Sequence, residues 1–236
     1  QDEYQEWNSL CTEYDIQELG EGGMGRVYLV KAKDESNSKF EPEDLISAIL
    51  SPDSMPELHQ LTSLFTEDRQ PLVLKVPISP EENQDKFIQE IWNLVLIPPH
   101  PNLVEWKYLR KLDEYPCILM EYLEGRSLAD LLCEKEENPW GSESDWLDDF
   151  FDVAIQVTWA LKHLHEHQLI HQDISPTNIL FRENGSNAQR VGLSDFGVSR
   201  FMTPERQEAE VVGWNRHFKA PEQLEGIAVK ATDIYS

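Results

Sequence analysis

The sequence predicts an α+β fold in which a β-rich first half is followed by an α-rich second half. Between residues 14 and 120, short apolar runs separated by turn residues are typical of strands, and a single clear helical pattern lies among them. After Gly125 helical patterns dominate, and the longest runs from Trp146 to His167. We therefore expect a β-rich lobe and an α-rich lobe with a cleft between them.

The first half is predicted to be a mostly antiparallel sheet with one main helix. Residues 14–33 carry apolar side chains on both sides of a glycine cluster, which indicates strand, turn and strand. Residues 34–70 shift to Ser, Asp, Glu and Pro, and we interpret them as an insertion, either a small helical pair or a solvated loop. A short strand at 72–76 and a helix at 81–96 follow. Two further strands are expected at residues 103–109 and 116–120.

The second half is predicted to begin with a short helix from Ser127. The long helix that follows carries a wide apolar stripe that must be buried in a core. Its members are Phe150, Val153, Ala154, Val157, Leu161 and Leu164. Short strands are expected at residues 179–181 and 191–193, joined by a turn-rich segment.

The gross composition limits the partners of the chain. Its formal net charge of −24 over 236 residues argues against non-specific binding to nucleic acid or to an anionic membrane, and it would attract a basic peptide substrate. No apolar run reaches the ~18 residues that a membrane-spanning helix needs. Three cysteines without a Cys-x-x-Cys pair indicate reduced thiols and a cytoplasmic location.

A glycine-rich loop lies between the first two predicted strands. The residues Gly20-Glu21-Gly22-Gly23-Met24-Gly25-Arg26-Val27 fit the pattern G-x-G-x-x-G-x-V, in which backbone N–H groups can approach phosphate oxygens. A dinucleotide-binding loop shares the three glycines but must open a helix, whereas strand formers follow here. A plain hairpin turn remains the alternative for this motif taken alone.

Lys75 and Glu90 are the next candidates. Lys75 lies inside an apolar strand, where an ammonium group is costly unless it meets phosphates or a carboxylate. Glu90 lies inward on the following helix, so its carboxylate could neutralise the buried ammonium group of Lys75. An edge-strand lysine and a surface glutamate are the alternatives for each residue taken singly.

Two later segments supply oxygen-bearing side chains. In His171-Gln172-Asp173-Ile174-Ser175-Pro176-Thr177-Asn178, the Asp173 carboxylate can accept or orient a hydroxyl proton. Asn178, together with Asp195 of the segment Asp195-Phe196-Gly197, offers the hard oxygen ligands that Mg²⁺ prefers when it bridges nucleotide phosphates.

In this order, and with Ala220-Pro221-Glu222 after them, these residues resemble the eukaryotic-type (Hanks-type) protein kinase family. The glycine loop is most similar to that of bacterial serine/threonine kinases. The resemblance implies a bilobal fold, with an N-lobe at residues 1–120, a hinge at 121–125 and a C-lobe at 126–236. The C-lobe would be incomplete, ending after the start of its long helix, and other domains of a longer polypeptide would follow.

The resemblance also implies roles for individual residues. ATP and Mg²⁺ would be the cofactors, Lys75 paired with Glu90 would hold the α- and β-phosphates, Asn178 and Asp195 the metal, and Asp173 the substrate hydroxyl. The nucleotide-binding set would comprise Leu19, Gly20, Glu21, Gly22, Gly23, Met24, Gly25, Val27, Val73, Lys75, Glu90, Met120, Glu121, Leu123 and Leu180.

The family also implies residues that stabilise this site. Leu94, Trp106, His171 and Phe196 would stack in a spine, and Asp233 would brace the catalytic loop.

Three positions depart from the family pattern. Ser175 stands where serine/threonine kinases carry a lysine, so stabilisation of the transferring phosphate should suffer. Asn215 stands where the same kinases place a threonine. Gln172 replaces an arginine that would bind a phosphorylated loop, so control by phosphorylation of Ser199 or Thr203 is not expected. Glu222 would pair in the family with an arginine that this chain lacks.

The sequence therefore favours a protein kinase that transfers the ATP γ-phosphate to a serine or threonine hydroxyl of a protein. A kinase-like phosphotransferase for small molecules also tolerates a catalytic loop without the lysine, but Ala220-Pro221-Glu222 and the full glycine loop argue against it. A pseudokinase or regulatory nucleotide-binding module is the third hypothesis. The retention of all five polar site residues together argues against it, and these are Lys75, Glu90, Asp173, Asn178 and Asp195.

Overall fold

The fold was analysed in a computed structural model. It describes residues 14–21, 25–32, 71–78, 80–112, 115–133, 145–183, 190–203, 208–211 and 217–236. The predicted insertion at residues 34–70 lies outside them. The chain divides into two compact units, which are described one at a time: residues 1–87 with 107–122, and residues 88–106 with 123–236.

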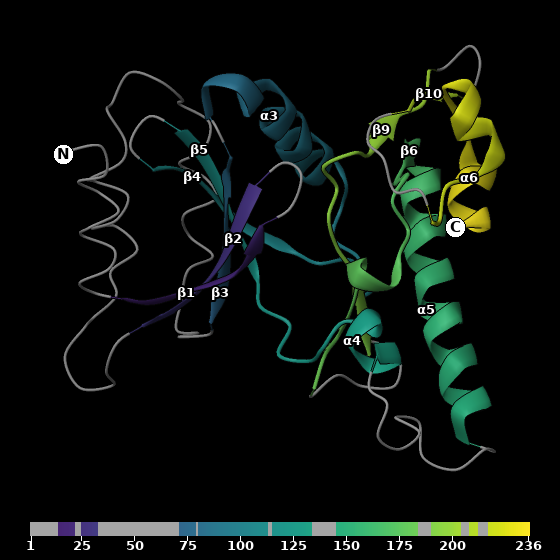
Figure 1. The fold of residues 1–236 in the computed structure, drawn as a ribbon, viewed down its shortest axis with the longest axis horizontal. Coiled ribbons are helices and arrows are strands. Elements are labelled where there is room, and N and C mark those ends of the chain that lie inside the picture. Colours follow the sequence, from purple (N-terminus) through teal and green to yellow (C-terminus); the bar gives the residue numbers. More distant parts are fainter. Residues whose placement is uncertain are drawn as a thin grey trace. The chain divides into compact units, whose positions relative to one another are not determined.

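The first unit is built on a five-stranded sheet with the strand order β1-β2-β3-β5-β4 (Figure 1). Its pairings β1–β2, β2–β3 and β3–β5 are antiparallel, as the sequence predicts. Leu74 and Cys117 are buried at its core, against partly buried side chains that include Val30 and Leu119. The strands are β1 (Tyr14–Glu21), β2 (Gly25–Ala32), β3 (Leu72–Pro77), β4 (Trp106–Leu112) and β5 (Tyr115–Glu121).

The predicted helix after β3 is confirmed as α3 (Pro80–Leu96). Four of its side chains recur at helical spacing and are 6% exposed or less, so one face of the helix is buried. These are Phe87, Glu90, Asn93 and Leu94. The helix begins in the first unit, and its residues from Ile88 onward belong to the second.

The described part of the second unit contains helices, short strands and 3₁₀ turns. Its β7–β8 hairpin matches the predicted strands at 179–181 and 191–193. The elements are α4 (Leu128–Cys133), α5 (Asp145–Glu166), β6 (Leu169–Ile170), η3 (Pro176–Asn178), β7 (Ile179–Phe181), β8 (Val191–Leu193), β9 (Arg200–Phe201), β10 (Ala209–Glu210), η5 (Pro221–Glu225), β11 (Ile227–Ala228) and α6 (Lys230–Tyr235).

Helix α4 begins with a capping interaction that its sequence encodes. The Ser127 hydroxyl accepts a hydrogen bond from the backbone nitrogen of Asp130, and the Asp130 carboxylate accepts from the Ser127 nitrogen and hydroxyl. This reciprocal pairing satisfies N–H groups that the first turn leaves unpaired. It also lowers the pKa of Asp130, because hydrogen bonds from Ser127 favour the charged carboxylate.

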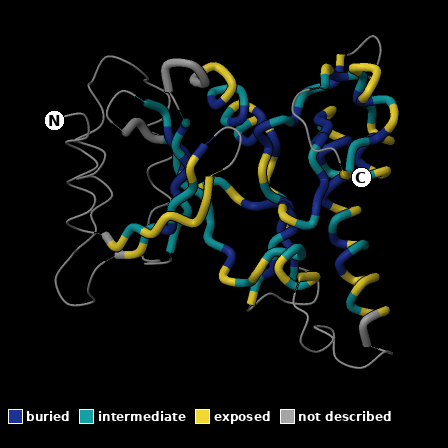
Figure 2. Tube along the Cα trace, viewed as in Figure 1, coloured by how far each residue is buried: buried dark blue, intermediate teal, exposed yellow. Residues whose placement is uncertain are grey.

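Helix α5 confirms the length of the predicted long helix but corrects its buried face. Val153, Leu161 and Leu164 are buried as expected, whereas Phe150 is 53% exposed. A second apolar stripe, made of Phe151, Ile155 and Trp159, is also exposed. Figure 2 shows exposed positions, in yellow, recurring along α5. Periodicity marked one apolar face, but the helix carries apolar side chains on two sides, and only contacts determine which side is buried.

The loop after α3 is tied to the second unit by hydrogen bonds. The Val104 nitrogen donates to the Leu193 carbonyl, and the Leu193 nitrogen donates to the Asn102 carbonyl, both at 2.9 Å. The Asn102 side-chain amide donates to Gln156 Oε1 on α5 at 3.0 Å. These bonds explain why residues 88–106 group with the second unit although they precede β4 in the chain.

In the part of the chain that the structure describes, no helix is both long enough and apolar enough to cross a membrane.

Candidate functional site

The predicted site residues fall into both units, and each unit is taken separately. In the first unit, the glycine loop joins β1 to β2, whose register pairs Gly20 with Val27 and Glu21 with Arg26. The loop is thus the turn of a hairpin and does not open a helix, which excludes the dinucleotide-binding alternative. Its tip, with Gly22, Gly23 and Met24, lies outside the described residues.

Lys75 lies directly beside this hairpin. It pairs in register with Val27 on β2 and with Ile118 on β5, and it is 6% exposed. A Cβ atom at Gly25 would lie 2.7 Å from the Val76 carbonyl oxygen and 3.2 Å from the Lys75 side chain. Gly25 is therefore required so that β3 and the Lys75 side chain can approach the loop.

An ion pair closes the same hairpin. Arg26 Nε donates to Glu21 Oε2 at 2.9 Å, and this raises the pKa of the exposed Arg26 guanidinium. Glu21 lies in the loop that would meet phosphates, so the pairing offsets a negative charge at that point.

The other predicted nucleotide contacts lie at defined places within their own units. Val73 on β3 pairs with Met120 on β5, and Glu121 ends β5. Leu19 on β1 is 46% exposed. In the second unit, Glu90 and Leu123 are buried, and Leu180 forms a bridge with Ser127.

In the second unit, Asp173 is held by Asn178. The Asn178 side-chain nitrogen donates to the Asp173 carbonyl at 2.8 Å and to the Asp173 carboxylate at 3.0 Å. The 3₁₀ turn η3, with Pro176 as its first residue, brings the two side chains onto one side of the loop. The carboxylate is thus fixed in orientation, and Asp173 stays partly exposed.

The β7–β8 hairpin brings Asn178 next to the Asp195 segment. Asn178 immediately precedes β7 and Ser194 immediately follows β8, and the Ser194 nitrogen donates to the Asn178 carbonyl at 2.9 Å. Asp195 has φ of 64°, a left-handed backbone that non-glycine residues seldom adopt, and its carboxylate accepts from the Gly197 nitrogen at 3.3 Å. Three predicted site residues, Asp173, Asn178 and Asp195, are thereby gathered in one unit.

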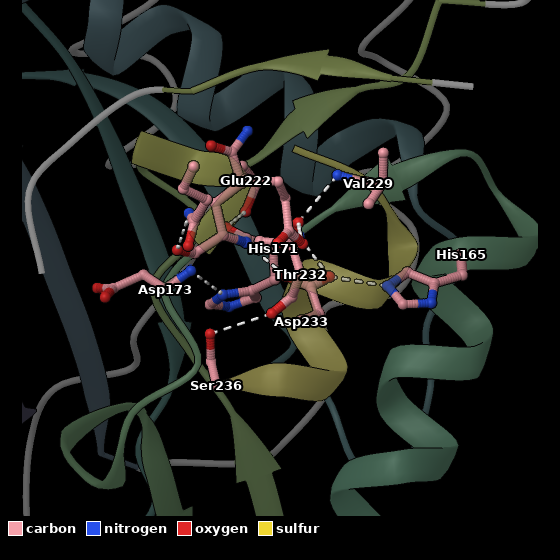
Figure 3. A network of polar contacts seen from close by, with 11 residues as sticks. His165, His171, Asp173, Glu222, Val229, Thr232, Asp233 and Ser236 are labelled. Carbon is pink, nitrogen blue, oxygen red and sulfur yellow. Dashed lines mark hydrogen bonds and ion pairs between the residues drawn. The ribbon is translucent and has the colours of Figure 1, made fainter. Parts of the chain in front are cut away.

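Asp233 braces the catalytic loop as expected (Figure 3). Its carboxylate accepts from the His171 nitrogen at 2.9 Å and from the Gln172 nitrogen at 2.7 Å, and it lies 2.8 Å from His165 Nε2. Asp233 is 2% exposed. One buried side chain on α6 therefore fixes two successive backbone groups next to Asp173.

Two of the predicted spine residues, His171 and Phe196, contact each other, and the other two line a cavity together with Phe196. Leu94, Trp106 and Phe196 line one small cavity in the second unit. The His171 ring meets the Phe196 ring edge-on, with centroids 5.1 Å apart. His171 Nε2 also lies 3.1 Å from the Ser194 carbonyl.

Ser175 and Glu222, at which the family pattern is not met, both form hydrogen bonds with other side chains. The Ser175 hydroxyl lies 2.8 Å from the Thr177 hydroxyl, so the position where the family resemblance implies a lysine holds a neutral hydrogen-bonded pair. The Glu222 carboxylate, for which the family pattern implies an arginine partner, accepts a hydrogen bond from the Thr232 hydroxyl at 2.8 Å. Asn215 lies outside the described residues.

Sequence reasoning missed Asn93, a buried amide on α3. Its side-chain nitrogen donates to the Ser199 carbonyl at 2.7 Å and to the Phe196 carbonyl at 3.3 Å. It lies one helical turn after Glu90 on the buried face of α3. A polar residue at a buried helix position is the sequence signal that could have pointed to a structural role for Asn93. Its acceptors are backbone carbonyls, which no side-chain pattern can reveal.

The comparisons with known proteins agree with this geometry. A family model described as a protein kinase domain matches residues 65–236, well over half of the chain. The chain belongs to the protein kinase family.

Named relatives of this kinase chain include bacterial and eukaryotic proteins. It is 32% identical over 139 residues to a probable serine/threonine-protein kinase of Clostridium perfringens, covering 58% of this chain and 19% of that protein. It is 31% identical over 140 residues to the serine/threonine-protein kinase PrkC of Bacillus subtilis, covering 58% and 20%. With human Nek2, a serine/threonine-protein kinase, it shares 29% identity over 167 residues, covering 66% and 35%. The kinase chain thus spans between a fifth and about a third of the length of these relatives.

Proposed function

We propose that this chain catalyses the transfer of the ATP γ-phosphate to a serine or threonine hydroxyl of a protein substrate. The observation that carries the proposal is the assembly of Asp173, Asn178 and the Asp195 segment by one loop and one hairpin, in a chain that belongs to the protein kinase family. The serine/threonine kinases among its relatives support the choice of acceptor.

Each residue takes a role in this proposal. Asp173 orients the acceptor hydroxyl and accepts its proton, and Asn178 fixes the Asp173 carboxylate in the required direction. Lys75 is buried beside the glycine hairpin, where an ammonium group needs an anionic partner, and in this proposal it binds the phosphates of ATP.

Mg²⁺ fits the donor set of Asn178 and Asp195. Both side chains offer oxygen ligands, which Mg²⁺ prefers. The amide nitrogen of Asn178 is engaged with Asp173, which leaves the oxygen of the same amide for the cation. When bound, Mg-ATP supplies the phosphoryl group and the charge neutralisation that its transfer needs.

The strongly negative charge favours a basic protein substrate, and the cysteine usage favours a cytoplasmic location. The proposal also includes a hinge at residues 121–125 between the two lobes. It further includes other domains in the natural protein.

The neutral pair Ser175–Thr177 is the observation that favours a second candidate, a kinase-like phosphotransferase for small molecules. A single assay separates the candidates. The full-length protein is incubated with labelled ATP and either itself, basic proteins or small alcohols, with Asp195→Asn as the control. Transfer to protein supports the proposal, and transfer to alcohols alone supports the second candidate. ATP binding without any transfer indicates a regulatory nucleotide-binding module and contradicts both.

A further inference from the structure

Gln172 is a buried amide next to the proposed catalytic Asp173, and the proposed function gives it no role. It is 6% exposed, and its φ of 70° places a non-glycine residue in the left-handed region. Such backbone conformations persist only where the surroundings over-determine them, and they cluster at functional sites. The hydrogen bonds that hold Gln172 in this conformation therefore indicate its role.

Both backbone groups of Gln172 are bound by side chains from other elements. Its nitrogen donates to Asp233 on α6 at 2.7 Å, and its carbonyl accepts from the Gln223 side chain on η5 at 3.3 Å. The Gln223 side-chain oxygen in turn accepts from the Ala220 nitrogen at 2.8 Å. The strained peptide is thus tied to two elements that lie later in the chain.

The Gln172 side chain makes a third tie. Its Nε2 donates to the backbone carbonyl of Glu210 at 2.8 Å, and Glu210 lies on β10, which pairs with β11. Strand β10 belongs to the segment that runs from Asp195 to Ala220. A neutral side chain therefore fastens the loop that carries Asp173 to the middle of this segment.

The surroundings of Glu210 fit a neutral tie. Arg200 on β9 is partly buried, burial lowers the pKa of its guanidinium, and the charge of Glu210 acts in the opposite direction. The Gln172 side chain binds the backbone carbonyl of Glu210 and not its carboxylate. This hydrogen bond therefore does not require a charge on either side chain.

We propose that Gln172 is a positioning residue, which sets the direction of the Asp173 carboxylate by tying the catalytic loop to β10 through its side-chain amide. This inference rests on the proposed function. Asp173 follows Gln172 directly, so a rotation of the strained peptide would move its carboxylate with it. A displacement of about 1 Å in such a group can reduce turnover about a hundredfold.

The test compares two substitutions that remove the N–H donor. Gln172→Glu keeps the length and places an acceptor against the Glu210 carbonyl, and Gln172→Leu keeps the approximate size without a charge. The control is Gln168→Glu, because Gln168 is an exposed glutamine that also has a left-handed backbone, with φ of 63°. The control makes the same chemical change at the same kind of backbone position.

Steady-state kinetics of the full-length protein give the first readout. We expect both Gln172 variants to lose about tenfold or more in kcat, with the KM for ATP changed by less than about twofold, and the control to match the wild type. A Gln172→Leu variant with wild-type kcat would overturn the proposal. So would an equal loss of nucleotide binding and turnover in both variants, because that result indicates a purely structural role.

Hydrogen exchange gives a second readout that does not depend on activity. Backbone amides at residues 171–175 and 208–211 should exchange faster in both Gln172 variants than in the wild type and the control. If the wild type transfers no phosphate, the proposed function fails, and the exchange rates still test the tie. Unchanged exchange in both segments would contradict the tie itself.

Discussion

One side-chain nitrogen of Asn178 donates to both the carbonyl and the carboxylate of Asp173, at 2.8 and 3.0 Å. Two bonds from a single amide restrict both the backbone and the side chain of the acceptor residue. The Asp173 carboxylate is therefore held before any substrate binds, which is the condition for an efficient proton acceptor.

Asp173→Asn should reduce kcat by about a hundredfold or more, because an amide cannot accept the hydroxyl proton. Binding of Mg-ATP, measured by calorimetry, should stay near the wild-type value, since the substitution keeps the shape of the side chain. Asp148→Asn, at an exposed carboxylate on α5, is the matched control. A variant that retains most of its turnover would show that Asp173 is not the proton acceptor.

Asp233→Asn should lower the free energy of unfolding by about 1–3 kcal/mol, because one buried backbone N–H group then faces an NH₂ group. The Asp233 carboxylate accepts from two backbone nitrogens, and an amide offers only one oxygen. Urea unfolding measures the change. A loss no larger than that of the exposed Asp148→Asn variant would contradict the bracing role.

Ser175→Lys should raise kcat by about tenfold, because it adds a cation near the transferring phosphate. The substitution also breaks the Ser175–Thr177 hydrogen bond, at a cost of about 1 kcal/mol. Ser175→Met, with a side chain of similar length and no charge, separates the two effects. If the lysine variant is no faster than the methionine variant, the reaction in this protein does not need a cation at that position.

Thr203→Val should leave turnover unchanged, as should treatment of the protein with a phosphatase. Residues 196–219 contain two hydroxyl side chains, Ser199 and Thr203. Ser199 is 0% exposed and its hydroxyl donates to the His171 carbonyl at 3.1 Å, so a kinase cannot reach it without local unfolding. Loss of activity in the Thr203→Val variant would show that phosphorylation of this segment controls the enzyme.

His100 should make the stability of the second unit sensitive to mild acid. Burial and the neighbouring His163, whose ring centroid is 4.8 Å away, lower the pKa of His100 from its ordinary value of 6.5. Below that value the unfolded chain binds a proton that the folded chain resists, so the free energy of unfolding falls as the pH drops toward the folded pKa.

Replacing His100 by asparagine should flatten this pH dependence. The asparagine oxygen can replace His100 Nδ1, which accepts from the Asn102 nitrogen at 3.1 Å. Urea unfolding over a pH series measures the slope, with His217→Asn at an exposed histidine as the control. The same slope in wild type and His100→Asn would assign the acid sensitivity to other groups.

The sequence predicts the elements of this fold better than their contacts. The strands at 179–181 and 191–193 are predicted because turn residues and apolar runs are local signals. The closeness of Asn178 to Ser194 follows from pairing those strands. Phe150 was assigned to the core and is exposed, because apolar side chains on two sides of α5 leave the buried side undetermined. Bonds to carbonyls, such as that from Gln172 to Glu210, depend on tertiary approach that no residue type encodes.

The exposed stripe on α5 gives the protein a natural optical probe. Trp159 is 48% exposed and shares the stripe with Phe151 and Ile155, so its indole lies half in water on an apolar surface. Any protein segment that covers this stripe would shift the emission of Trp159 toward shorter wavelengths. The difference in fluorescence between the wild type and Trp159→Phe would therefore show when the outer side of α5 is covered.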